Sequence, residues 1–251
     1  MSTPVAEFRE VVKDYPVGLL RREKLRAVDA VNLKIEPGQI FGLLGPNRAG
    51  KTTLVKLLLS LCKPTSGQVF RFGKPTTERS TLIKVGYVHE NHAFPRYLSA
   101  SALLEYYGAM SLLSEPRVRA RMPELLELVG LEDRANEPIS RFSKGMIQRL
   151  GVAQALINDP DLLVLDEPSE GLDLSGRTMV FDVADKLRKE GKTVLLISHV
   201  LPEVERVCDS IAVIRSGTIV YDGSIKKLTE GPEGNQGSSL EEAVRKFYEP
   251  R

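Results

Sequence analysis

The chain has 251 residues, of which 42% are hydrophobic, and this suits one large α/β domain with a substantial core. Its 35 basic and 33 acidic residues leave a formal net charge of +2, so nothing electrostatic suggests a nucleic-acid partner. No apolar run approaches the roughly 20 residues that span a bilayer, and the N-terminus lacks the form of a signal peptide. We therefore expect a soluble, cytoplasmic protein whose two cysteines are free thiols.

The N-terminal part of the chain reads as β structure that leads into a first helix. Alternating segments at 7–15 and 27–35 predict two antiparallel strands joined by a basic, solvated loop. A buried strand at 39–44 is followed by a glycine-rich loop and an apolar helix over 54–61 that begins near Gly50. Two further strands are predicted at 68–72 and 84–88.

The pattern then becomes helical. Apolar residues at spacings of three and four predict helices between 99 and 131, one of them capped by Ser114 with Pro116 in its first turn. Another helix is expected after Ser143, reaching about residue 157. We interpret residues 90–158 as a helical subdomain inserted in the core.

The core pattern resumes after this insert. Strands are predicted at 161–166, 193–197, 210–215 and 218–221, with helices at 175–189 and 202–207. Alternating buried strands and helices imply a mainly parallel sheet covered on both faces. We expect one domain over 1–229, then a tail over 230–251 made of a flexible linker and a short helix.

The stretch between the 39–44 strand and the following helix fits the phosphate-loop pattern G-x-x-x-x-G-K-[ST]. Glycines let the backbone curl so that its N–H groups cradle phosphates, and the helix start adds its positive dipole end. Lys51 would contact the outer phosphates, and the Thr52 hydroxyl would ligate Mg²⁺. The predicted nucleotide-binding residues of the loop are Gly45, Pro46, Asn47, Arg48, Ala49, Gly50, Lys51, Thr52 and Thr53.

Carboxylates and a histidine end the next two buried strands. Asp166 could hold Mg²⁺, and Glu167 could polarise a water molecule for attack on the γ-phosphate. Without the phosphate loop, two acids after a strand would be read as a solvated turn. His199 could donate a hydrogen bond to the γ-phosphate and the attacking water, or could simply follow a helix-capping Ser198.

A second anion site is predicted in the helical subdomain. Ser143 and Gly145 lie at the start of a helix, where a hydroxyl, backbone N–H groups and the helix dipole act together. A plain capping motif is the alternative interpretation. Because this site lies outside the phosphate loop's own segment, its phosphate could belong to another subunit.

These motifs together, in this order, resemble those of the ATP-binding subunits of ABC transporters, over nearly the whole chain from Tyr15 to Tyr221. The resemblance identifies Phe142-Ser143-Lys144-Gly145-Met146 as the family signature and Leu162 to Glu167 as Walker B with its glutamate. It identifies residues 169–173 as the D-loop and His199 as the switch histidine. Glu90 would take the glutamine-loop position, and Tyr15 the position of the aromatic residue that stacks on adenine.

The resemblance implies an ATPase with ATP and Mg²⁺ as its cofactors and with Thr52, Glu90 and Asp166 around the metal. It implies a head-to-tail dimer in which Ser143 and Gly145 of one subunit cover the nucleotide of the other. ATP-driven closure would power transport through separate polytopic membrane subunits, with this chain peripheral on the cytoplasmic face. Residues 91–97 are candidates for that contact, through Phe94 or Tyr97. The alternative is a non-transport ABC ATPase with a regulatory or translation-associated role.

Three departures from the family pattern qualify this expectation. Glu90 replaces a glutamine and adds negative charge near the metal. Lys144 and Met146 alter the signature, a form that resembles exporter-type systems. Arg48 stands where glycine is common, and a positive φ there would cost on the order of 1 kcal/mol.

Overall fold

The computed structural model describes residues 2–17, 23–229 and 239–248 of the chain. The molecule divides into two compact units. One is formed by residues up to 82 together with those from 195 onward, and the other by residues 83–194. The predicted insert at 90–158 lies within the second unit.

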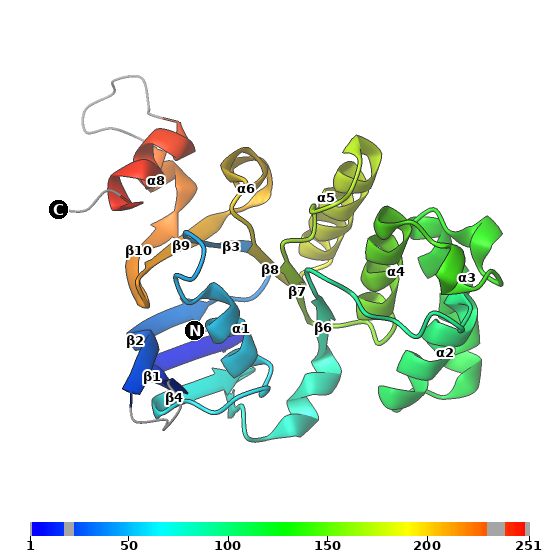
Figure 1. Cartoon of the computed structure of the whole chain (residues 1–251), viewed down its shortest axis with the longest axis horizontal. Helices are drawn as coiled ribbons and strands as arrows, with labels where there is room; N and C mark the ends of the chain where they lie inside the picture. The colour runs from blue at the N-terminus through cyan, green and yellow to red at the C-terminus, as the bar shows by residue number, and fades with distance from the viewer. Residues whose placement is uncertain (1, 18–22, 230–238, 249–251) are drawn as a thin grey trace. The chain divides into compact units, whose positions relative to one another are not determined.

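An antiparallel sheet opens the first unit, as the alternating N-terminal segments predicted. Its strand order is β2-β1-β4-β5, and the first three of these strands are labelled in Figure 1. The strands are β1 (Ala6–Val17), β2 (Glu23–Ile35), β4 (Ser66–Arg71) and the short β5 (Lys74–Pro75). Register shifts interrupt the β1–β2 pairing, and bulges of this kind increase the local twist of a sheet. Part of the predicted basic loop, residues 18–22, lies outside the described residues.

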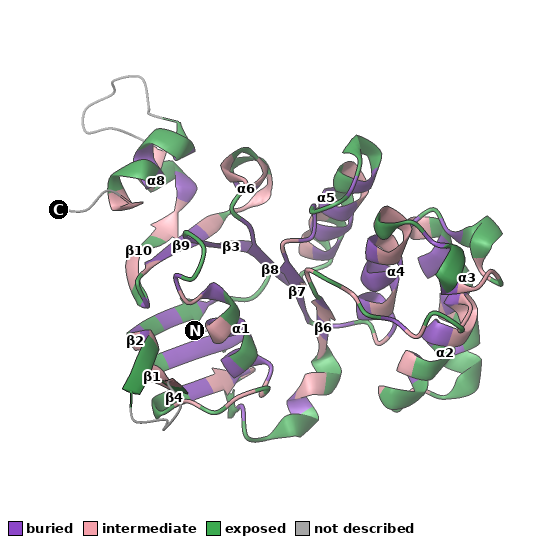
Figure 2. Cartoon of the chain, viewed as in Figure 1, coloured by how far each residue is buried: buried purple, intermediate pink, exposed green. Residues whose placement is uncertain are grey.

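The strand that leads into the phosphate loop belongs to a second sheet, part of which lies in this unit. Here β3 (Ile40–Leu44) pairs in parallel with β9 (Ser210–Arg215), which pairs antiparallel with β10 (Thr218–Ser224). The end of β8 (Thr193–Ile197) lies beside β3. All residues of β3 are buried, so the loop that follows starts from a fixed base (Figure 2).

Within the described residues, four α-helices belong to the first unit. The phosphate loop leads directly into α1 (Lys51–Leu58), which starts beside Gly50 as predicted and ends before the predicted residue 61. The other three are α6 (Leu201–Val207), α7 (Ile225–Thr229), which the sequence did not predict, and α8 (Leu240–Tyr248). Helix α8 contacts α6, α7 and β9. The predicted linker falls almost entirely on residues 230–238, which are outside the described part of the chain.

The second unit combines two parallel strands with a helical region. Strand β6 (Val85–Val88) pairs with β7 (Leu162–Asp166), whose residues are all buried. The helices are α2 (Ala100–Met110), α3 (Glu115–Leu128), α4 (Lys144–Leu156) and α5 (Leu174–Lys189). Short 3₁₀ turns occur at Glu132–Arg134 and Ile139–Arg141, and a further one, Arg79–Lys84, begins in the first unit and ends in the second. Ser114 caps α3 by position, with proline in the first turn as predicted.

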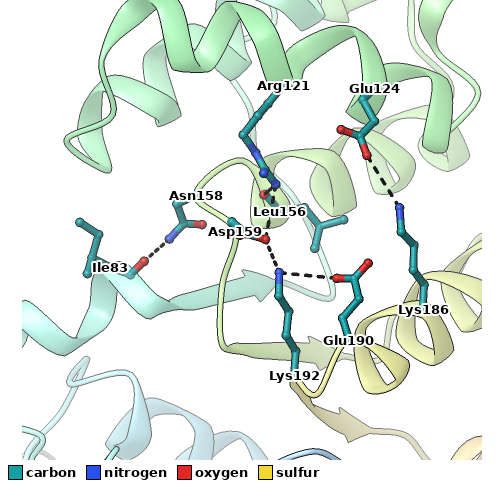
Figure 3. A network of polar contacts seen from close by, with 9 residues as sticks. All are labelled: Ile83, Arg121, Glu124, Leu156, Asn158, Asp159, Lys186, Glu190 and Lys192. Atoms are coloured by element: carbon teal, nitrogen blue, oxygen red, sulfur yellow. Dashed lines mark hydrogen bonds and ion pairs between the residues drawn. The ribbon is translucent and has the colours of Figure 1, made fainter.

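Polar contacts join α3, α5 and the connections between them (Figure 3). Asp159 accepts from Lys192 and lies 3.7 Å from an Arg121 nitrogen, so it is the shared anion of this network. These pairs help to hold α3 near the start of β7 and the end of α5. Within the described residues, no helix is long and apolar enough to cross a membrane.

Candidate nucleotide-binding site

Two glycines let the phosphate loop fold tightly between neighbouring strands. A Cβ on Gly45 would lie 2.4 Å from the carbonyl oxygen of Ile214 in β9. Gly50 has φ of 117° and would place a Cβ 2.6 Å from the carbonyl oxygen of Ala27 in β2. Both positions therefore exclude a side chain, which explains the two glycines that define the motif.

The turn between β9 and β10 supports the loop from outside. The N–H of Gly217 donates to the Ala49 carbonyl at 2.9 Å, and Asp29 N–H donates to the Gly217 carbonyl at 2.9 Å. The turn itself was predicted from Ser216 and Gly217, but its contact with the phosphate loop was not. Nothing in the sequence links a turn at residues 216–217 to a loop near residue 49.

Lys51 is the buried cation of the loop, with a relative exposure of 7%. Its ammonium donates to the carbonyl oxygens of Gly45 at 2.5 Å and Pro46 at 3.3 Å. The loop thus curls around this ammonium, which is the expected partner of the outer phosphates. Thr52 follows at the exposed start of α1.

Arg48 has the positive φ that was expected to strain its backbone. Its φ is 66°, in the left-handed region that disfavours residues with a Cβ. The residue is exposed, so the loop conformation and not side-chain packing imposes this angle.

Tyr15 and His199 belong to the same unit as the loop. The Tyr15 hydroxyl lies 3.8 Å from the Cys62 sulfur, and burial raises its pKa while a hydrogen bond with Thr53 lowers it. Tyr15 is therefore placed next to the last residue of the phosphate loop. His199 is exposed after β8, and the preceding Ser198 hydroxyl accepts from the Val200 N–H at 3.0 Å.

At the end of β7 in the second unit, the buried Asp166 is influenced by two other acidic residues. Asp166 is 4% exposed, and the Tyr87 hydroxyl donates to its Oδ2 at 3.3 Å. Burial raises the pKa of Asp166, and the negative charges of Glu167 and Glu90 add to this effect. A bound dication would relieve this repulsion, so the donor set suits Mg²⁺, which needs few protein carboxylates beside phosphate and water oxygens.

Glu167 has an unusual backbone. Its φ is 49°, and non-glycine residues in this region cluster at functional sites. The strain fixes the direction of the residue that directly follows the buried strand. Tyr87, which contacts Asp166 from β6, is a site residue that sequence reasoning missed. The only available signal was its position three residues before Glu90.

The signature residues lie at the start of α4 as predicted. The Ser143 hydroxyl accepts from the Met146 N–H at 3.2 Å, which caps the helix. Ser143 is exposed and opens onto a hollow of about 490 Å³. The D-loop lines the same hollow, whose walls come from Ser143, Lys144, Gly145, Met146, Arg149, Gly171 and Asp173.

The candidate residues thus form two groups, one in each unit. The phosphate loop, Tyr15 and His199 belong to the first unit. The second unit holds the carboxylates of Asp166 and Glu167 at the end of β7 and, separately, the hollow at the start of α4. In the loop after Glu90, Phe94 is buried at 8% exposure whereas Tyr97 is 82% exposed. Only Tyr97 of these two aromatic residues presents a large surface to a partner.

The sequence model of the family described as "ABC transporter" matches residues 28–170, more than half of the chain. The chain belongs to the ABC transporter family. An ABC transporter ATP-binding protein of Synechocystis, itself uncharacterized, is 38% identical over 248 residues, which is 97% of this chain and 70% of the relative. The Nod factor export ATP-binding protein I of Cupriavidus metallidurans is 40% identical over 82% of this chain and 69% of the relative.

A solved structure agrees with this assignment. It is a dimeric ATP-binding cassette in a post-hydrolysis state bound to ADP and Pi. It superposes with a TM-score of 0.79 at 26% identity, over 88% of this chain and 98% of that one. The chain is accordingly an ABC transporter ATP-binding protein with ATPase activity, and the predicted α/β fold with an antiparallel portion and a parallel portion is confirmed.

Proposed function

We propose that this ABC ATPase powers export through separate membrane subunits, by ATP-driven closure of a head-to-tail dimer. The observation that carries the proposal is the exposed signature hollow. Ser143 caps a long helix whose start is a ready anion site, and the phosphate loop belongs to the other unit of the chain. A nucleotide presented by a second copy would complete the site.

The roles of the other residues follow from their chemistry. Residues 45–53 bind the triphosphate, Tyr15 stacks on adenine, and Thr52, Asp166 and Glu90 hold Mg²⁺. The metal, when bound, would offset the negative charge of the phosphates and of Asp166 and its acidic neighbours. Glu167 polarises the attacking water, and His199 donates a hydrogen bond to the γ-phosphate. The order of the motifs along the chain supports this assignment.

ATP acts in this account as part of the interface between two copies. Each triphosphate bridges the loop of one copy and Ser143 and Gly145 of the other, so the closed dimer is favoured only with nucleotide present. Hydrolysis and phosphate release remove the bridging charge, and the dimer opens. This cycle of closure and opening is the mechanical output.

Membrane subunits would receive that output. Tyr97 is the proposed contact, since it is the exposed aromatic residue of the 91–97 loop. The chain would then lie on the cytoplasmic face of the membrane. The name of the Cupriavidus relative, a Nod factor export ATP-binding protein, favours the export direction. Co-purification with a polytopic membrane protein would support this part of the proposal.

The proposal is tested by Glu167→Gln, which removes the charge that polarises water and keeps the side-chain shape. We expect ATP turnover to fall by about 100-fold or more and Mg-ATP to trap a stable dimer. Light scattering should then report about twice the monomer mass of 27.8 kDa. Glu190→Gln is the matched control, because it makes the same carboxylate-to-amide change at an exposed residue of the same unit. Wild-type turnover or a purely monomeric Glu167→Gln protein would contradict the proposal.

A further inference from the structure

The start of α4 is attached to the segment that follows Glu167. Three side chains of the first two helical turns reach residues 168–173, hereafter the D-loop segment. The contacts are Lys144 Nζ to Glu170 Oε1 at 3.3 Å, Gln148 Nε2 to the Pro168 oxygen at 3.4 Å, and Arg149 Nη2 to Asp173 Oδ1 at 3.2 Å. The helix start and the D-loop segment are therefore tied along their length.

Lys144 makes the contact nearest to the signature serine. Its aliphatic stem covers Gly171, where a Cβ would lie only 2.9 Å from the lysine Cδ and Cε. Gly171 also has φ of 75°, so the turn both needs glycine and provides the seat for the stem. The ammonium then reaches Glu170, one residue before that seat. We call this contact the Lys144–Glu170 clasp.

The clasp links the neighbourhoods of two residues, Ser143 and Glu167, that would act on different nucleotides. Glu167 directly precedes the D-loop segment, three residues before Glu170, and would act on the ATP of its own copy. Ser143 is the residue directly before Lys144 and would act on the ATP of the partner copy. A shift of either residue is therefore passed to the other through the clasp, together with the Gln148 and Arg149 contacts, unless the tied segment bends.

We propose that Lys144 is a positioning residue which, through Glu170, couples the two ATP sites of the dimer. This inference rests on the proposed head-to-tail dimer. Nucleotide entry at one site orders the signature of the other copy, and the clasp carries that order to the Glu167 of that same copy. The expected result is positive cooperativity of hydrolysis with respect to ATP.

The rival explanation is that Lys144 contacts phosphate directly. A substitution of Glu170 distinguishes the two explanations. Glu170→Gln leaves the ammonium in place and removes only its carboxylate partner. If Lys144 acted on phosphate directly, freeing it from Glu170 would preserve or raise activity. If the clasp couples the sites, Glu170→Gln and Lys144→Met should have the same effect.

The experiment measures ATP hydrolysis against ATP concentration for the full chain. The variants are Lys144→Met, Glu170→Gln, their double variant and the reversed pair Lys144→Glu with Glu170→Lys. Lys189→Met is the matched control, because Lys189 forms an ion pair with Asp185 that is exposed and lies on the same unit. Binding of a fluorescent ATP analogue to dilute protein and the thermal midpoint are recorded in parallel.

We expect each single variant to lower the Hill coefficient to about 1, the value for independent sites, and to reduce kcat by up to about fivefold, as an exposed ion pair allows. The double variant should lose no more than either single variant, and the reversed pair should recover cooperativity. Analogue binding and thermal midpoint should match the Lys189→Met control.

Two results would overturn the inference alone: cooperativity kept in Lys144→Met, or a loss in Lys144→Met without a loss in Glu170→Gln. Absence of cooperativity in the parent would overturn it as well, with the proposed function intact if Glu167→Gln still dimerises. Absence of that dimer would overturn both.

Discussion

The imidazole of His92 occupies the space where a side chain on Gly151 would have to lie. A Cβ built on Gly151 would be 2.0 Å from His92 Nε2, and the ring stacks on Phe94 with centroids 4.8 Å apart. The loop that follows Glu90 is thereby anchored to α4, the helix that begins at the signature. Glycine at position 151 is required by this ring and not by its own backbone.

Gly151→Ala should therefore destabilise the protein, although alanine favours helices. The added methyl must displace the His92 ring, and overpacking of this kind costs about 1–3 kcal/mol. Urea unfolding followed by circular dichroism measures the change. His92→Ala in the same chain removes the obstacle, so the double variant should be less destabilised than the sum of the two single variants. Additive losses would show that the ring and the helix do not compete for this space.

The same ring predicts a pH dependence of stability. Burial, with a smaller contribution from nearby His89, lowers the pKa of His92 from 6.5 to about 4. The unfolded chain therefore takes up a proton on His92 at a higher pH than the folded chain does. The free energy of unfolding is thus unaffected by this residue above about pH 6.5 and decreases as the pH falls from there towards about 4. His92→Phe keeps an aromatic ring without this titration. Its urea midpoint should fall less between pH 7.5 and pH 5 than that of the parent; an equal fall would contradict the assignment.

Arg48→Gly should tighten ATP binding, because glycine accepts the positive φ of this position without strain. Relief of about 1 kcal/mol corresponds to about a fivefold lower Kd. Arg48→Ala is the matched control, since it removes the charge but keeps the Cβ that causes the strain. Calorimetric titration with ATP compares the three proteins. The strain account fails if the glycine variant binds no more tightly than the alanine variant.

Much of the fold was readable from local pattern. Buried runs such as residues 193–197 became strands with the predicted bounds, and Ser143 capped α4 where the anion motif placed it. These features depend on residues close in sequence, whose spacing carries the signal. The alternation of the first two strands likewise predicted an antiparallel pair.

The features that escaped prediction depend on contacts between distant residues. Arg71 is fully buried, yet it donates to the Leu58 carbonyl and to Thr81 Oγ1, with no carboxylate partner among the described residues. Nothing local marks a strand arginine as a core residue. Tyr87 against Asp166 and Gly217 against Ala49 are similar cases. Helix α7 was missed because five residues are too few to show a helical period.

The most direct test of the central claim mixes two inactive variants. Lys51→Ala disables the phosphate loop of its own copy, and Ser143→Arg disables the signature that would cover the partner's nucleotide. In a head-to-tail pair of one of each, one site has both an intact loop and an intact signature. Random mixing at equal amounts should therefore restore at most about a quarter of wild-type ATP turnover, because half the dimers have one working site each and coupling between the sites would lower the rate of a single site. If the mixture stays as inactive as either variant alone, Ser143 does not serve the nucleotide of a second copy, and the account is wrong.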